Sequence, residues 1–184
     1  MPRVKPTMTP EPSATGRQIR YGVAMSLDGY IATADGGYDW IVMDPDIDFK
    51  GIFDRFDAFV MGRKTFSGGG AAMMGGAKVL VFSRTLRQED HPTVTIVSGP
   101  LEPAIRELKS KPGKDIWLFG GGEFFRSMLE ARLVDGIDVA IIPVVLGGGI
   151  PFLPAPGPTV KLTLTHHRLY AKTGIMSLEY ALRY

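Results

Sequence analysis

The sequence predicts a single α/β domain with a mostly parallel central sheet, flanking helices and an antiparallel hairpin at the end of the chain. Three observations support this prediction: a length suited to one domain, apolar segments that alternate with helical ones, and two alternating segments at the C-terminus. The chain has 184 residues, of which 45% are hydrophobic and 22% charged. This composition excludes a disordered chain, and the length is too short for two ordinary domains.

Short apolar segments recur between turn residues from Ile19 onward. Several are almost continuously apolar, which is typical of strands covered on both faces. The segments are IRYGVAM, DAFVMG, AKVLVFS, VTIVSG, DIWLFGG and IDVAIIPVVLGG. The last one contains Pro143, which cannot donate a ladder hydrogen bond, so we expect an edge or a bulge there.

Segments with helical spacing lie between these strands, at residues 46–56, 101–111 and 123–132. The alternation of strands and helices indicates parallel strands joined by right-handed crossovers. The end of the chain differs, because VKLTLTHHRLY and GIMSLEYALRY alternate in polarity around AKTG and need no helix between them. We therefore expect an α/β domain over residues 19–184.

The first 18 residues are rich in Pro, Thr and Ser, and we expect a disordered tail there. The tail carries a formal charge of +2, which equals the net charge of the whole chain. The folded part is therefore nearly neutral and gives no reason to expect a nucleic-acid partner. No segment approaches the roughly 20 apolar residues of a membrane helix, and none resembles a signal peptide. We expect a cytoplasmic protein with no membrane partner.

Several catalytic classes lack their usual residues. The chain has no cysteine, which excludes thiolate metal sites and cysteine nucleophiles. Of the three histidines, His166 and His167 are adjacent on an expected strand and point to opposite faces, so we predict no metal site. The motifs HExxH, GxSxG, GxxxxGK[ST] and GxGxxG are all absent.

Polar and glycine-rich turns follow three of the expected strands, where ligands bind in open parallel sheets. The turn at residues 120–122 consists of three glycines before a helix, which lets a phosphate approach free backbone N–H groups, although a tight turn alone would also need glycine. Residues 62–65 (GRKT) add two cations and a hydroxyl, which suit a pyrophosphate; the alternative is a helix cap with solvated charges. Ser83 and Arg84 follow KVLVF, where an arginine suits a 2′-phosphate and favours NADPH over NADH.

These turns are part of an ordered set of motifs: MSLDGYIA, Asp39–Trp40, MGRKTF, SRT, FGGGEFFRSML and LVDGIDVAIIPVVLGGGIPFL. In this order they resemble the dihydrofolate reductase superfamily and, more closely, its riboflavin-biosynthesis reductase (RibD C-terminal domain) branch. The resemblance runs from Ile19 to the end of the chain. It implies a dihydrofolate reductase-like fold, NADPH as the hydride donor, a small-molecule substrate and a homodimer.

The resemblance also implies the cofactor contacts. The diphosphate and adenosine ribose would be bound by Gly62, Arg63, Lys64 and Thr65, and the 2′-phosphate by Ser83 and Arg84. The glycine turn under the diphosphate corresponds to Gly121, Gly122 and Glu123, and the nicotinamide would lie against Ala24, Ile31 and Ala32.

The candidates for catalysis and substrate binding are chosen mainly by their position in the sequence. In folate reductases a carboxylate early in the helix before the MGR motif binds the pterin, and counting back from Gly62 gives Asp46, which helix capping would also explain. Asp39 is the other catalytic candidate, and Trp40 is a candidate aromatic wall for the substrate. Asp28 in the SLDG turn is a further substrate candidate, with an Asx-type turn partner as its alternative role.

The sequence thus predicts an NADPH-dependent reductase that acts on a small C=N or C=O compound. One candidate substrate is the pyrimidine reduced in riboflavin biosynthesis, 5-amino-6-(5-phosphoribosylamino)uracil. The segment from Trp40 to Lys50 is acidic, however, and departs from a pocket for a ribose phosphate. The alternatives are a nucleotide-binding protein without turnover and a true dihydrofolate reductase.

Overall fold

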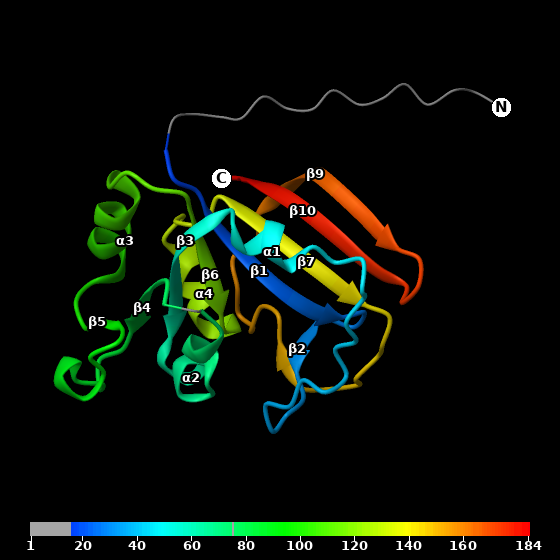
Figure 1. Ribbon diagram of the computed structural model, residues 1–184, viewed down its shortest axis with the longest axis horizontal. Helices are drawn as coiled ribbons and strands as arrows, with labels where there is room; N and C mark the ends of the chain where they lie inside the picture. The colour runs from blue at the N-terminus through cyan, green and yellow to red at the C-terminus, as the bar shows by residue number, and fades with distance from the viewer. Residues whose placement is uncertain (1–15, 75) are drawn as a thin grey trace.

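The computed structural model describes residues 16–74 and 76–184. They form a domain around an eight-stranded sheet with the order β5-β4-β3-β6-β1-β7-β10-β9 (Figure 1). The first six of these strands are parallel to one another, and β10 and β9 are antiparallel, as predicted. The strands are β1 (Ile19–Ser26), β3 (Phe56–Gly62), β4 (Lys78–Phe82), β5 (Thr95–Val97), β6 (Asp115–Gly120), β7 (Gly136–Ile142), β9 (Lys161–Tyr170) and β10 (Ile175–Arg183). A separate pair joins β2 (Tyr30–Ala32) to β8 (Ile150–Pro151).

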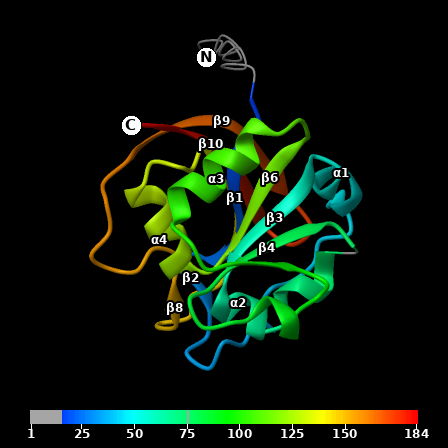
Figure 2. The same ribbon diagram turned by 90° about the vertical axis from the view of Figure 1, so that its left-hand side faces the viewer.

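Helices cover both faces of the sheet, with α3 and α4 on one side of the strands and α1 on the other (Figure 2). They are α1 (Phe49–Phe53), α2 (Arg63–Ser67), α3 (Leu101–Ser110) and α4 (Gly122–Glu130), with short 3₁₀ turns at Gly70–Met74 and Gln88–Asp90. Under α4 the ring of Tyr21 stacks on Phe125 with centroids 3.9 Å apart. On the opposite face Phe53 of α1 lies 5.1 Å from Trp117, ring to ring. The apolar runs of the parallel strands are thus buried from both sides.

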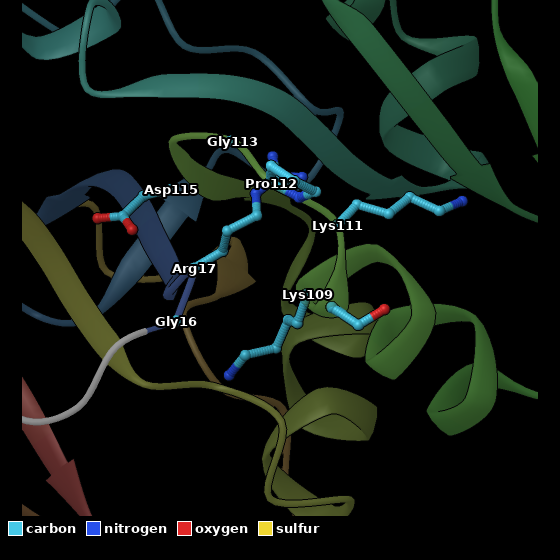
Figure 3. A pocket seen from close by; sticks show the side chains of 8 residues that line it. Gly16, Arg17, Lys109, Lys111, Pro112, Gly113 and Asp115 are labelled. Carbon is cyan, nitrogen blue, oxygen red and sulfur yellow. The ribbon is translucent and has the colours of Figure 1, made fainter.

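The chain is anchored to the fold from Arg17, one residue before the predicted end of the tail. Arg17 lies at a surface hollow on the amino-terminal edge of the sheet (Figure 3), and its guanidinium pairs with Asp57 and donates to the carbonyl oxygen of Lys114 at 2.6 Å. The backbone N–H of Gln18 donates to Asp115 at 2.9 Å. These two residues of the predicted tail therefore contact the folded part through residues from distant parts of the chain. Residues 1–15 of the predicted tail lie outside the described residues.

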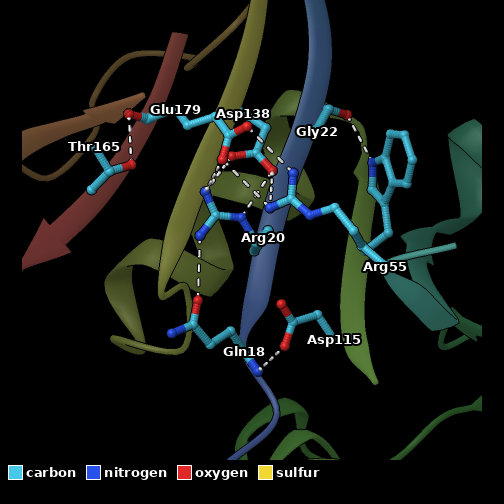
Figure 4. A network of polar contacts seen from close by, with 9 residues as sticks. Gln18, Arg20, Gly22, Arg55, Asp115, Asp138, Thr165 and Glu179 are labelled. Carbon is cyan, nitrogen blue, oxygen red and sulfur yellow. Dashed lines mark hydrogen bonds and ion pairs between the residues drawn. The ribbon is translucent and has the colours of Figure 1, made fainter. Parts of the chain in front are cut away.

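A charge network crosses the face of the sheet that carries α1 (Figure 4). Arg20 of β1 donates to Asp138 of β7 at 2.8 Å and lies 3.6 Å from Glu179 of β10, while Arg55 lies 3.7 Å from Asp138. Burial alone would lower the pKa of Arg20, but the hydrogen bond and charge of Asp138, with Glu179, raise it above its ordinary value. The network ties together the three strands on which the sheet changes from parallel to antiparallel.

Two predicted elements are shorter in the structure. Helix α1 begins after Asp48, whose side chain accepts from the N–H of Gly51 at 2.8 Å as an N-cap, so residues 46–48 are not helical. Strand β7 ends at Ile142, because Pro143 has no N–H to continue the ladder. The expectation of an edge or bulge was wrong, since β7 lies between β1 and β10 and stops before the proline.

Within residues 16–74 and 76–184, the helices are all too short or too polar to cross a membrane.

Candidate cofactor site

The three predicted turns meet at one edge of the sheet. Strands β4, β3 and β6 are neighbours, and their carboxyl ends lead into Ser83, Gly62 and Gly121 respectively. The glycines allow close approach: a Cβ on Gly62 would lie 3.2 Å from the Cβ of Phe124, and a Cβ on Gly121 would lie 3.4 Å from the Thr65 hydroxyl oxygen. The structure therefore brings together the turns that the sequence could place only separately.

The glycine turn owes its shape to backbone conformation and packing. Gly120 has φ +131°, which favours glycine and lets the chain leave β6 sharply. The first N–H groups of a helix have no acceptor within the helix. In α4 no side chain caps them either, because the N-cap residue is Gly121. A Cβ on Gly122 would lie 2.6 Å from the carbonyl oxygen of Pro151, so Gly122 is also needed for the β8 loop to pack. Glu123 is exposed and lies 3.8 Å from Arg126.

Three cations at this edge lack ion-pair partners in the described part of the chain: Arg63 and Lys64 in α2, and Arg84 after β4. All three are exposed. By contrast, Arg87 a few residues further on lies 3.8 Å from Glu89. The carboxyl edge of β4, β3 and β6 therefore carries an uncompensated positive charge beside backbone N–H groups.

Ser83 stabilises the turn that contains Arg84. Ser83 is 8% exposed, and its hydroxyl oxygen accepts from the N–H groups of Thr85 at 3.2 Å and Leu86 at 3.0 Å. Its hydroxyl is therefore engaged in shaping the turn, which holds Arg84 outward at the surface.

The hollow of Figure 3 is also lined by cations, but they are neutralised. Lys109 and Lys111 contact Asp135 and Glu107, each at 2.6 Å, and Arg17 pairs with Asp57. This hollow lies at the start of the parallel strands. It is therefore at the opposite edge from the GRKT turn (residues 62–65) and the glycine turn (residues 120–122), which we call the phosphate-type turns. Free positive charge thus distinguishes the carboxyl edge from the hollow.

The proposed nicotinamide contacts lie at the ends of β1 and β2. Ala24 packs in one apolar cluster with Trp40, Ala140 and Ile142. Ala32, which follows Ile31 in β2, pairs with Ile150 of β8. In the main sheet β1, which carries Ala24, is the neighbour of β6, whereas Ile31 and Ala32 belong to the separate β2–β8 pair.

Asp28 joins two loops at this end. Its carboxylate accepts from the Ser26 hydroxyl at 2.7 Å and from the backbone N–H groups of Leu146 at 3.1 Å and Gly147 at 2.7 Å. The Ser26 hydrogen bond, with those two N–H groups, lowers the pKa of Asp28. These contacts give Asp28 a structural role that joins distant loops, which differs from the local Asx-type turn of the alternative interpretation. Sequence reasoning missed Ser26 and residues 146–147, and the joint presence of SLDG and VVLGGG was the signal that could have linked them.

The acidic candidates are not together. Asp46 precedes α1, is exposed, and its carboxylate lies 2.8 Å from the ammonium of Lys172, so its expected place early in the helix was wrong. Asp39 is exposed and makes no hydrogen bond or ion pair with the side chains and loops that the structure describes. The buried acid is Asp44, 2% exposed, which accepts from the Thr173 hydroxyl at 2.7 Å; this bond lowers its pKa. Its partner is 129 residues away, so no local pattern could have identified it.

Comparison with known proteins agrees with this architecture. The sequence profile of the RibD C-terminal domain matches residues 17–175. Protein YyaP of Bacillus subtilis strain 168 is 32% identical over 179 residues, which cover 89% of this chain and 94% of YyaP. The crystal structure of a putative riboflavin biosynthesis protein from Shewanella sp. PV-4 is 25% identical with a TM-score of 0.77, covering 91% of this chain and 99% of that one.

A dihydrofolate reductase from Enterococcus faecalis, in a complex with NADP(H), has a TM-score of 0.68 at 17% identity and covers 92% of this chain and 100% of its own. At that identity the likeness concerns the fold alone. The predicted dihydrofolate reductase-like fold and its RibD C-terminal branch are confirmed by these matches.

Proposed function

The chain belongs to the RibD C-terminal domain family, and from this premise we propose that it is an NADPH-dependent reductase that transfers a hydride to a C=N or C=O group of a small molecule. The observation that carries the proposal is the convergence of the glycine turn, the GRKT turn and Arg84 at one edge of the sheet. NADPH presents phosphate at two places, the diphosphate and the 2′-phosphate. The edge offers free cations and N–H groups at two matching places.

The residues at the edge fit this cofactor. The glycine turn and the GRKT turn lie side by side, since a Cβ on Gly121 would lie 3.4 Å from the Thr65 hydroxyl oxygen. In the proposal Arg63, Lys64, Thr65 and the start of α4 hold the diphosphate, and Arg84 holds the 2′-phosphate. The nicotinamide ring would lie against Ala24, Ile31 and Ala32.

When bound, NADPH supplies the hydride, and the chain supplies orientation, exclusion of water and a proton. Reduction of C=N or C=O also requires a proton at the heteroatom. Asp39 and Asp46 are the proposed proton-handling residues. Asp46 is paired with Lys172, so Asp39 is the one whose carboxylate is free of an ion pair among the described residues.

Parallel calorimetric titrations with NADPH and NADH at fixed salt test the proposal. We expect tight binding of NADPH and weak binding of NADH. Binding of neither would refute the proposal. NADPH binding without substrate-dependent oxidation across pyrimidine, pterin and carbonyl compounds would favour a nucleotide-binding protein, and dihydrofolate turnover abolished by Asp46→Asn would favour a true dihydrofolate reductase.

A further inference from the structure

The order of the strands determines which part of the edge would face the substrate. Arg84 follows β4, the two phosphate-type turns follow β3 and β6, and the next strands along the edge are β1 and β7. Adjacent strands lie about 4.8 Å apart. A dinucleotide held by its phosphates at β4, β3 and β6 therefore directs its reactive ring toward the ends of β1 and β7. This step rests on the proposed function.

The surface at the ends of β1 and β7 is small and apolar. Ala24 and Ala140 are direct neighbours in the β1–β7 register, so their side chains point to the same face. They belong to one apolar cluster with Ile142, Ile41 and the half-buried Trp40. The two alanines add little side-chain volume, and an indole beside them suits a flat ring.

The segments that lead to and from this surface contain no basic residue. Residues 21–49 include six aspartates and neither lysine nor arginine, and residues 139–160 include no charged residue at all. One of the aspartates is Asp28, whose carboxylate accepts from the Ser26 hydroxyl and from two backbone N–H groups, as expected for an ionised group. The charge at this end is therefore opposite in sign to that at the phosphate-type turns.

Of three cations near this end of the sheet, two are paired with carboxylates. Lys172 lies 2.8 Å from the carboxylate of Asp46, and Arg168 donates to the backbone oxygen of the same residue at 3.3 Å. Deeper on this face, Arg20 is held by Asp138. Lys172 and Arg20 are thus ion-paired, whereas Arg168 keeps its positive charge, because a backbone oxygen carries no net charge.

We infer that the substrate of this reductase is a flat, uncharged or cationic carbonyl or imine compound that carries no phosphate. The two alanines and Trp40 recognise the flat apolar part, and the six aspartates, which outnumber the nearby Lys172 and Arg168, repel an anion. The chain thus uses its positive charge for the phosphates of the cofactor and withholds it from the substrate.

Matched pairs of compounds test this inference. One pair is the aminouracil ribonucleoside and its 5′-phosphate, and the other is 4-methoxybenzaldehyde and 4-formylphenyl phosphate. We measure kcat/KM from NADPH oxidation. In a pair that the protein reduces, we expect kcat/KM to be at least roughly tenfold higher for the compound without phosphate. The advantage should shrink between about 0.1 M and about 1 M salt, as the screening length falls from about 10 Å to about 3 Å.

A variant with an added cation supplies the control. Val42 is 47% exposed and lies two residues after Trp40. Val42→Lys should raise kcat/KM for the phosphorylated member about tenfold relative to Val42→Gln, which adds a polar group without charge. The inference is overturned if the phosphorylated compound has an equal or higher kcat/KM, or if neither compound of either pair is reduced. In both cases NADPH binding by the same preparation would still support the cofactor site. Failure of the same preparation to bind NADPH instead refutes the proposed function.

Discussion

Removal of the Arg84 guanidinium is expected to weaken NADPH binding and leave NADH binding unchanged. The side chain is exposed and has no ion-pair partner in the described part of the chain, so Arg84→Ala removes no contact within the fold. A change in affinity would then come from the lost contact with the 2′-phosphate, which NADH lacks. The stability of the folded protein should stay as it is.

The size of the effect follows from the type of bond. Hydrogen bonds to charged groups contribute about 1.5–3 kcal/mol each. At about 1.4 kcal/mol for each factor of ten, the dissociation constant for NADPH should rise about 10- to 150-fold. Because Arg84 is exposed and screened by salt, we expect the lower part of this range at physiological ionic strength.

Calorimetric titration of the wild type and two variants measures the effect. Arg87→Ala is the matched control, because Arg87 lies in the same loop with a 78% exposed side chain but is 3.8 Å from Glu89. This control should change NADPH affinity by no more than about twofold, as expected for an exposed ion pair. An equal loss of NADPH and NADH affinity in Arg84→Ala, or an equal effect of Arg87→Ala, would refute the assignment.

Three other predictions concern the fold and the assembly. Gly22→Val should lower the free energy of unfolding in urea by about 1–3 kcal/mol, because a Cβ at Gly22 would lie 2.6 Å from the Trp117 indole; an unchanged midpoint would contradict this. Thr173→Val removes the hydrogen bond that lowers the pKa of Asp44. The stability due to that lowered pKa is present above the ordinary pKa of 3.8 and is lost as pH falls through the pKa of the folded state. The difference in free energy of unfolding between wild type and variant should therefore vanish in acid. A difference that does not depend on pH would contradict this prediction. We also predict a homodimer, measured as a mass of two chains by light scattering, which a monomeric mass would disprove.

The strands and most helices could be predicted because their signals are local. The apolar runs bounded by turn residues correspond to the strands, and the alternating end segments correspond to β9 and β10. Two element boundaries differed because one residue changed the local rule: Asp48 capped α1 and delayed its start, and Pro143 ended β7.

The candidate site divides in the same way. The sequence by itself determined its chemistry, because the glycines, the GRKT cations and Arg84 are contiguous with the ends of predictable strands. Only the tertiary structure decided which of these groups are neighbours and which charges are already satisfied. Asp28 bonds to Leu146 and Asp44 to Thr173 across 118 and 129 residues of chain. The physical reason is that hydrogen bonds and ion pairs depend on distance in space, which the strand order and register set and which spacing along the chain does not encode.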